Sequence, residues 1–508
     1  MKKSPRKFAA LIIISLVLIF SVQVMAQKPI RRGPASTEEI AKARAVVTAN
    51  IDSFKAHRSY IFAMGIDNPL VVSEYKAWMK KYPNNVNIPL AVGTVFYTNE
   101  MPQAREFLLK ASSMTPGNAK VWSMLADDAL CRGEQAQFRE FLRKATLADT
   151  TNAGYAGAYL RTFRDDNAAE YKHKVYEFVK RFPESDYGAW VLCELAEATA
   201  DLNVKIGYYE DLRKLYPPQK FGWSAAGMTA LADIYLQTDL QKALILTDEM
   251  GDGKDWKLRR QIAESLISIN KLQQEKNYPA AMLEFDKIKL PRYNDISDYI
   301  ALKGASLLDE SGNVKAAYDS LAVIFAKNPT DKLYTALTLY GEKSGKNKDQ
   351  VDQEIEMIRN EAAVSAYPFD LDLYTGKGKL KLNDLKGKVV LLTFWFPGCN
   401  PCKAEFPHFE AVLKKINSEN VAYVGINIAP EQDPYVTTLI KNNKYSFIPL
   451  HGNEAFAEKN YGVYAAPQNF LIDQDGKIIY KNFRINEKNH RTLELMILSL
   501  LKKSANRS

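Results

Sequence analysis

Hydrophobic residues recur three and four positions apart from Ser36 to about Ala363. This spacing places them on one face of an α-helix, and the scarcity of β-branched runs argues against strands. Because the pattern continues for several hundred residues, it predicts many short helices rather than one. We therefore expect residues 36–362 to form an all-α region.

The helical pattern is broken at regular intervals. Five breaks lie 33 or 34 residues apart, at Pro83, Pro116, Thr150, Pro183 and Pro217. This step is close to the tetratricopeptide period of about 34 residues. Apolar residues at matching positions are Ala104, Leu108, Ala111, Trp122, Leu125, Ala126, Leu142, Ala145, Ala317 and Leu321. Later spacings, near Pro291 and Pro329, exceed the period, so we predict a degenerate tetratricopeptide-like array of helix pairs.

After Ala363 the pattern becomes that of an α/β domain with a mixed sheet, which we place at residues 363–508. Alternation on both sides of Gly376 and Gly378 predicts a hairpin. Continuous apolar runs predict buried strands. The expected elements are strands at 389–394 and 421–428, a hairpin at 469–483, and helices at 401–417, 433–461 (with a loop through 446–453) and 487–503.

The first 26 residues have the pattern of a secretory signal peptide. Basic residues precede an apolar run from Phe8 to Phe20, and Val24 and Ala26 are small enough for the cleavage site. Cleavage would leave Gln27 at the start of a linker over 27–35. The alternative is an uncleaved anchor, although the run is shorter than the ~20 residues that a spanning helix needs. We expect export to the bacterial periplasm, with no membrane-spanning segment after cleavage.

Composition narrows the class of protein. The 508 residues are 46% hydrophobic and 25% charged, as in a folded protein of several domains. The net charge of +9 comes partly from the signal and otherwise from mixed Lys and Glu along helices, so we expect no nucleic-acid partner. Four cysteines are too few for a disulfide scaffold. Cys131 and Cys193 are expected to be small buried apolar residues.

The other two cysteines, Cys399 and Cys402, follow a predicted buried strand and open a predicted helix. Residues at i and i+3 lie on one side of the first turn, near enough to form a disulfide. Unpaired N–H groups and the helix dipole stabilise a thiolate there, and the thiolate is the nucleophile. We expect Cys399, the more exposed, to attack a disulfide and Cys402 to resolve the mixed disulfide.

This part of the chain resembles the thioredoxin superfamily, specifically its exported TlpA/ResA-like thiol–disulfide reductases. The resemblance covers residues 363–508. The matching segments, in order, are 383–395, 399–407, 461–463, 466–473 and 475–476.

The resemblance implies roles for several residues. Pro467 would be a cis-proline against the sulfurs, and the backbone of Ala466 would pair with an extended substrate. Glu405 would move the proton of Cys402, and Trp395 would form part of the substrate-binding wall. Relatives usually carry Trp before the first cysteine, where this chain has Gly398. The missing aromatic predicts a more open surface.

Further features implied by the resemblance concern the surrounding chain. The stretch 430–460 corresponds to a segment that these proteins insert into the basic thioredoxin fold. Thr393 stands where cytoplasmic thioredoxins have a buried Asp, which favours Glu405 as the acid–base group. Potentials of related proteins span about −270 to about −120 mV, so reductant and oxidant both stay open.

Other site classes fit less well. A zinc site needs four ligands, and His408, His451 and His490 are off the face of Cys402 or isolated, so we expect no metal and no cofactor. The peroxiredoxin motif does not precede either cysteine. The expected function is extracytoplasmic reduction of protein disulfides, with a membrane electron donor and a partner protein bound by the helical repeats. The alternative is a helical-repeat binding scaffold whose C-terminal domain is mainly a docking module.

Overall fold

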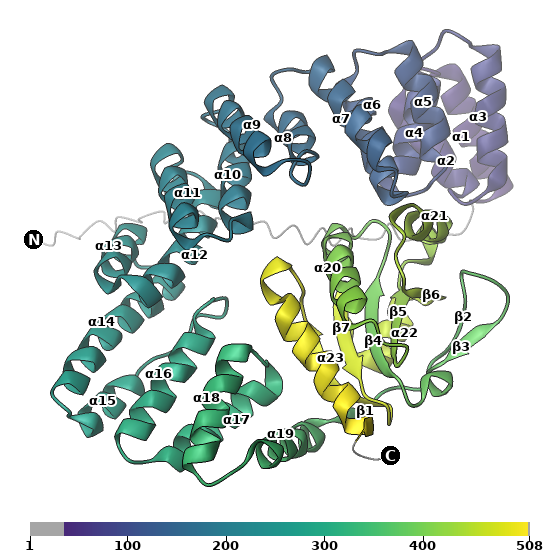
Figure 1. Ribbon diagram of the computed structural model, residues 1–508. Coiled ribbons are helices and arrows are strands. Elements are labelled where there is room, and N and C mark those ends of the chain that lie inside the picture. Colours follow the sequence, from purple (N-terminus) through teal and green to yellow (C-terminus); the bar gives the residue numbers. More distant parts are fainter. Residues whose placement is uncertain (1–34, 506–508) are drawn as a thin grey trace, which may run out of the picture.

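The protein, in a computed structural model that describes residues 35–505, consists of a helical region followed by an α/β domain (Figure 1). The signal peptide predicted at 1–26, and the linker up to residue 34, lie outside the described residues.

Residues 35–363 contain nineteen α-helices. They are α1 (Thr37–Ala49), α2 (Phe54–Met64), α3 (Pro69–Lys81), α4 (Asn87–Thr98), α5 (Ala104–Met114), α6 (Ala119–Cys131), α7 (Gln135–Ala148), α8 (Ala153–Arg161), α9 (Ala168–Arg181), α10 (Asp186–Ala198), α11 (Leu202–Leu215), α12 (Gly222–Thr238), α13 (Leu240–Met250), α14 (Lys254–Gln274), α15 (Tyr278–Phe285), α16 (Ser297–Glu310), α17 (Val314–Lys327), α18 (Asp331–Lys343) and α19 (Lys348–Ala362).

The predicted breaks fall where every second helix ends. The five positions directly follow the last turns of α3, α5, α7, α9 and α11. Three of the five helices that follow, α6, α8 and α10, begin at a capping side chain: Asn118, Asn152 and Ser185 each accept a backbone N–H of the first turn. The helix-pair organisation is therefore confirmed. Its assignment to the tetratricopeptide family stays a prediction.

Neighbouring helices bury the residues that the repeat pattern selected. Leu108 of α5 and Leu125 of α6 are fully buried in one cluster with Ala126. Cys193 of α10 is buried as expected, and a Cβ on Gly227 of α12 would lie 3.4 Å from its sulfur. Small residues at such positions let helix backbones approach closely.

The C-terminal domain is built on a six-stranded mixed sheet with the order β1-β8-β7-β4-β5-β6. Strand β4 runs parallel to β5 and antiparallel to β7. The strands are β1 (Val364–Ser365), β4 (Val389–Trp395), β5 (Val421–Asn427), β6 (Ile448–His451), β7 (Gln468–Ile472) and β8 (Lys477–Phe483), with a separate hairpin of β2 (Asp370–Asp372) and β3 (Lys379–Lys381). The helices are α20 (Asn400–Ile416), α21 (Asp433–Asn443), α22 (Glu454–Tyr461) and α23 (His490–Ala505), with 3-10 turns at Leu382–Leu385, Pro430–Gln432 and Glu487–Asn489.

Two strands differ from the sequence prediction. The predicted loop through 446–453 contains β6, which pairs in parallel with the end of β5. Strand β1 pairs antiparallel with β8 through Val364 and Ser365 alone. Both are short strands at the sheet edges, and β6 contains Pro449, which weakens a local strand signal. Their pairing with β5 and β8 is what makes them strands.

Helices and the hairpin cover the two faces of the sheet. On one face, α20, α21 and α23 bury Phe406, Leu439 and Ile497 in a cluster that also contains both cysteines. On the other face, the residue before β2 of the hairpin, Phe369, and Ala457 of α22 are buried in a second cluster. Strand β4 is buried along its whole length, so the segment that ends at the cysteines is fixed from both sides.

The helical region curves as an arc around the C-terminal domain and meets it at both ends (Figure 1). At the end formed by α4 to α6, the Tyr435 hydroxyl of α21 donates to Asp128 at 2.9 Å, and Asn442 donates to the carbonyl of Arg132 at 2.8 Å. At the other end, Arg491 of α23 pairs with Asp331 of α18 at 2.8 and 2.9 Å. Among residues 35–505, no helix has the length and hydropathy required to cross a membrane.

Gly425 provides a test of the packing beneath the cysteine pair. A Cβ at this position would lie 2.6 Å from Phe447 and 2.8 Å from the Trp395 ring nitrogen. We expect Gly425→Ala to destabilise the C-terminal domain by about 1–3 kcal/mol, because overpacking shifts neighbouring side chains. Denaturant unfolding measures this.

The matched control is Gly207→Ala on the exposed face of α11, where a new Cβ meets nothing within 4 Å. That change should stabilise its helix by about 0.5–1 kcal/mol. Equal unfolding curves for Gly425→Ala and the unmodified protein would contradict the packing described above.

Candidate redox-active site

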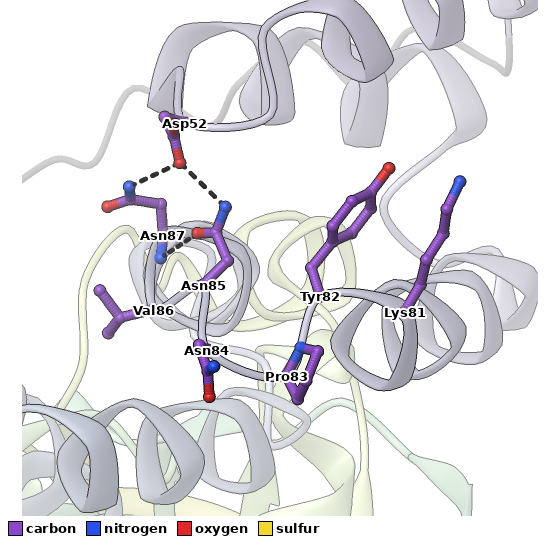
Figure 2. Close-up of a pocket in the computed structure, with 8 residues that line it drawn as sticks. All are labelled: Asp52, Lys81, Tyr82, Pro83, Asn84, Asn85, Val86 and Asn87. Atoms are coloured by element: carbon purple, nitrogen blue, oxygen red, sulfur yellow. Dashed lines mark hydrogen bonds between the residues drawn. The ribbon is translucent and has the colours of Figure 1, made fainter.

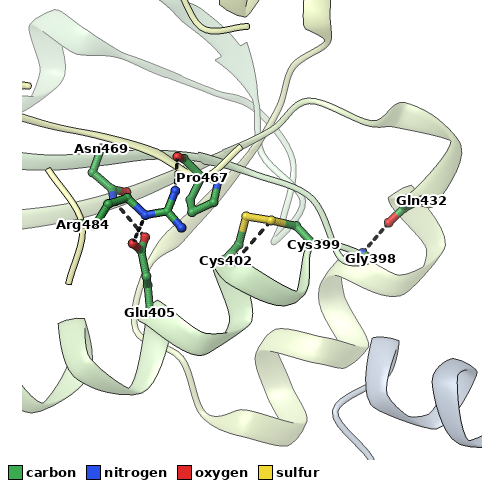
Figure 3. Close-up of a disulfide and its surroundings, with 8 residues drawn as sticks. All are labelled: Gly398, Cys399, Cys402, Glu405, Gln432, Pro467, Asn469 and Arg484. Carbon is green, nitrogen blue, oxygen red and sulfur yellow. Dashed lines mark hydrogen bonds and ion pairs between the residues drawn. A yellow bond between two sulfur atoms is a disulfide. The ribbon is translucent and has the colours of Figure 1, made fainter. Parts of the chain in front are cut away.

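The two cysteines lie at the start of α20, directly after the buried strand β4. Cys399 is the N-cap residue of this helix, and its Sγ accepts a hydrogen bond from the backbone N–H of Cys402 at 3.2 Å. The two sulfurs form a disulfide, with 5.3 Å between the Cα atoms (Figure 3). Pro401 is in the first turn, where its missing N–H removes no helix hydrogen bond. The two sulfurs therefore lie together at the first turn of α20.

Both sulfur-bearing residues are nearly inaccessible. Cys399 is 3% exposed and Cys402 is 0% exposed. The predicted order of exposure holds, but Cys399 is not an open surface group in the full chain. Access to its sulfur therefore depends on the residues that surround it.

A cis peptide bond joins Ala466 and Pro467, as the sequence predicted. Figure 3 shows Pro467 beside the disulfide, in the loop that enters β7. Its carbonyl accepts a hydrogen bond from Nη1 of Arg484 at 3.1 Å. The cis-proline loop is thus held next to the cysteines by a charged side chain from the segment after β8.

Glu405 is buried one turn beyond Cys402, with 3% of the residue exposed. Its carboxylate accepts hydrogen bonds from Nδ2 of Asn469 at 2.9 Å and from the backbone N–H of Ile485 at 3.3 Å. It also pairs with Nε of Arg484 at 2.6 Å. Burial raises the pKa of Glu405 above its ordinary value, while these three partners oppose the rise. A carboxyl with a raised pKa keeps its proton to higher pH than an ordinary glutamate, which favours a role in proton exchange.

Asn469 and Arg484 were not identified from the sequence as site residues. Asn469 was part of a matching segment, but its side-chain direction follows only from the β4–β7 register, which places it opposite Thr393. The Asn469 side-chain oxygen and the Thr393 hydroxyl are buried, and neither has a hydrogen-bond partner within residues 35–505. No sequence signal marks Arg484, because it follows β8 and reaches the site only through the fold.

The expected role of Trp395 needs correction. The side chain is completely buried and packs edge-on against Phe406 and Phe447, with ring centroids 5.4 and 5.2 Å away. It therefore supports the site from beneath and presents no surface to a substrate. Trp395 is the last residue of β4, and this strand is buried along its whole length.

The absence of an aromatic at Gly398 does not open the surface, contrary to the sequence prediction. The side chain of Gln432 fills this place, and its Oε1 accepts a hydrogen bond from the Gly398 N–H at 2.6 Å (Figure 3). The Gln432 amide in turn donates to the carboxylate of Glu100, at the turn between α4 and α5. The helical region thus reaches the residue that precedes Cys399.

Cys131 also differs from the sequence prediction. It is only partly buried, and its Sγ lies 3.9 Å from Nζ of Lys403, the residue after Cys402. Burial raises the pKa of Cys131 and lowers the pKa of Lys403. Cys131 and Cys193 are both free thiols. The structure places Cys131 at the contact between the helical region and α20.

No group of three or more potential metal ligands occurs among the described residues, 35–505. His490, which was expected to be isolated, contacts His408, with Nε2 of His490 2.8 Å from Nδ1 of His408. A surface pocket of about 530 Å³ lies in the helical region, around Asp52 and residues 81–87 (Figure 2). Asp52 accepts hydrogen bonds there from Asn85 and Asn87. This pocket lies in the helical region, whereas the disulfide lies at the start of α20 in the C-terminal domain.

Residues 361–496 match the Redoxin family. Among curated proteins, the chain is 36% identical over 101 residues to the thiol-disulfide oxidoreductase ResA of Bacillus thuringiensis subsp. konkukian (20% of this chain, 58% of the relative). It is 32% identical over 117 residues to the thiol:disulfide interchange protein DsbE of Yersinia pestis (23% and 59%). The chain thus spans less than two thirds of the length of these relatives.

Among solved structures, the chain is similar to the thioredoxin domain of a thiol-disulfide oxidoreductase from Bacteroides vulgatus, with a TM-score of 0.24 and 23% identity. The match covers 26% of this chain and 96% of that one.

Arg484 provides a test of the electrostatics around Glu405. We expect Arg484→Gln to raise the pKa of Glu405 further, because removing the adjacent cation disfavours the carboxylate. The neutral carboxyl should then persist to higher pH. Difference infrared spectroscopy over a pH series measures this, with Glu405→Gln identifying the carboxyl band.

Arg484→Lys keeps the charge and should reverse most of the change. An unaltered carboxyl titration in Arg484→Gln would show that the ion pair does not influence the ionisation of Glu405.

Proposed function

We propose, from the match of residues 361–496 to the Redoxin family, that this chain is an extracytoplasmic thiol–disulfide oxidoreductase that reduces protein disulfides. The observation that carries the proposal is the pair Cys399 and Cys402 at the N-terminus of α20, beside the cis peptide bond of Pro467. The similarity to ResA and DsbE supports the same reaction class.

The reaction begins with both cysteines reduced. The Cys399 thiolate attacks one sulfur of the substrate disulfide, a mixed disulfide forms, and the other substrate sulfur leaves as a thiolate that takes up a proton. Cys402 then attacks Cys399, which releases the second substrate thiol and closes the Cys399–Cys402 disulfide. Two electrons pass to the substrate. A reduced dithiol donor must then supply two further electrons to reduce the Cys399–Cys402 disulfide again.

Cys402 must lose its proton before it can attack. Glu405 lies one helical turn further along α20, buried and with a raised pKa, and we assign to it the transfer of this proton. The backbone of Ala466 is assigned to pair with an extended segment of the substrate beside the sulfurs. Trp395 has no direct part in this scheme, because it is fully buried.

The proposal also includes a cellular location and an electron donor. The N-terminal signal pattern supports export to the periplasm, where a membrane protein would supply electrons to the Cys399–Cys402 disulfide. The helical region would hold the partner protein, because arrays of helix pairs present extended binding surfaces.

The competing function is that of a binding scaffold, with the helical region holding a partner and the C-terminal domain serving for docking. The contacts of Tyr435 and Arg491 with the helical region are compatible with a docking role. The intact cysteine pair favours the enzyme, since docking alone needs no disulfide.

Cys402→Ser separates the two functions. We expect this variant to accumulate mixed disulfides with exported proteins through Cys399, because the resolving thiol is missing. Non-reducing gels and mass spectrometry of cell extracts measure this. Cys399→Ser, which lacks the attacking sulfur, is the matched control.

No mixed disulfide in Cys402→Ser, together with no reduction of a model disulfide by the unmodified protein in the presence of dithiol, would favour the scaffold.

Deletion of residues 36–360 tests the role of the helical region. The shortened protein should retain its activity towards a small disulfide and lose activity towards the protein captured by Cys402→Ser, with a raised KM for that protein. Steady-state kinetics with both substrates measures the difference. If both substrates are reduced as well as by the full chain, the helical region does not bind the partner.

A further inference from the structure

Gly398, the residue before Cys399, is hydrogen-bonded to Gln432, and Gln432 is hydrogen-bonded to Glu100 of the helical region. The Gly398 N–H donates to Gln432 at 2.6 Å, so this backbone group is already occupied. A Cβ on Gly398 would lie 3.0 and 3.2 Å from the two terminal atoms of the Gln432 amide. Gln432 therefore packs directly on the backbone next to Cys399, in space that a larger residue at position 398 would need.

Gln432 is itself fixed. It is 2% exposed, at the end of the 3-10 turn Pro430–Gln432 that leads into α21. Its Oε1 accepts from Gly398 while its Nε2 donates to Glu100, so both ends of the amide are used. Such a side chain cannot rotate away from Cys399 without breaking two hydrogen bonds, one of them to a charged group.

Glu100 occupies an unusual place in its turn. Five helix–helix turns have a residue with positive φ two positions after the helix ends: Glu100 (57°), Gly133 (70°), Lys276 (56°), Gly312 (82°) and Gly345 (79°). Glycine adopts this left-handed conformation without a steric penalty, whereas glutamate does not. The turn after α4 thus keeps a residue that its backbone disfavours, and the side chain of that residue binds Gln432.

We propose that Gln432, held by Glu100 of the helical region, is a specificity-determining residue of the redox site. It covers the approach to Cys399 and restricts the reaction to disulfides on small molecules or narrow, extended segments. This inference rests on the proposed exchange reaction and identifies its class of substrate. It also gives the helical region a direct effect on access to the sulfur, in addition to any partner that it binds.

The geometry around Cys399 agrees with this role. The disulfide is buried in the full chain, with Cys399 3% exposed. A dithiol that reduces it must bring one sulfur in line with the Cys399–Cys402 bond, break that bond and release Cys402 as a thiolate. Its second thiol then closes its own disulfide and releases Cys399. A bulky reductant has to displace Gln432 for this approach, and a small one does not.

The test uses the full oxidised chain and two reductants, dithiothreitol and a folded protein that exposes a dithiol on a broad surface. We expect Gln432→Ala and Glu100→Gly to raise the rate constant with the folded protein by about tenfold, the scale of one hydrogen bond to a charged group, with a much smaller change for dithiothreitol. Glu100→Gly removes the carboxylate and leaves a residue that suits the left-handed backbone, so folding should be preserved.

Two matched controls separate this effect from general loosening. Lys276→Gly makes the same backbone change in the turn after α14, and Asp331→Asn breaks a contact between the helical region and α23 that lies away from the disulfide. Both should react like the unmodified protein. Equal rates with the folded dithiol protein for Gln432→Ala and the unmodified chain, or the same increase in the controls, would overturn the proposal.

The rates measured in this test can be interpreted separately from the test of the proposed function. These rates report only how easily added dithiols reach Cys399, whereas the trapping experiment with Cys402→Ser reports exchange with proteins. A scaffold without enzymatic activity would still show a covered disulfide.

Discussion

The redox site depends on the pairing of strand β4 at the centre of the sheet. Because β4 pairs with β5 on one side and β7 on the other, its last residue is fixed in position and Cys399 begins α20 at a defined place. The same β4–β7 register brings the start of β7, and with it Pro467, to the end of β4. One hydrogen-bonded ladder thus assembles both the sulfur pair and the cis-proline loop, although about 65 residues separate them in the chain.

Behind the cysteines lies a small buried polar group in an otherwise apolar core. Glu405 is the only carboxylate in direct contact with Arg484 among the ion pairs of the described residues, and Asn469 completes its hydrogen bonding. Burial of a charged group is unfavourable unless partners compensate, so the balance of desolvation and pairing sets the ionisation of Glu405. Since Arg484 also holds the carbonyl of Pro467, one side chain positions both the Glu405 carboxylate and the cis-proline loop.

The helical region is more than an attached module. Helices α4 to α6 and the turns beside them contact the segment around α21 through Tyr435 and Gln432, and Lys403 on α20 faces Cys131. The segment around α21 and the start of α20 therefore join the helical region to the site. This arrangement gives a physical reason for the low exposure of Cys399 in the full chain, because the contact lies on the side of Gly398.

The sequence by itself determined the division into an all-α and an α/β part, the helix-pair spacing, most strands of the sheet, and the cysteine pair at the start of a helix. These features follow from local periodicity and short motifs, which the chain encodes within a few residues. The cis-proline was implied by the resemblance of the surrounding segments to a known family. Strand β6, the burial of Trp395, and the contacts of Arg484 and Gln432 were decided only by the tertiary structure. Each of them depends on groups that are far apart in sequence, and a side chain's partner across such a distance has no local pattern from which it could be predicted.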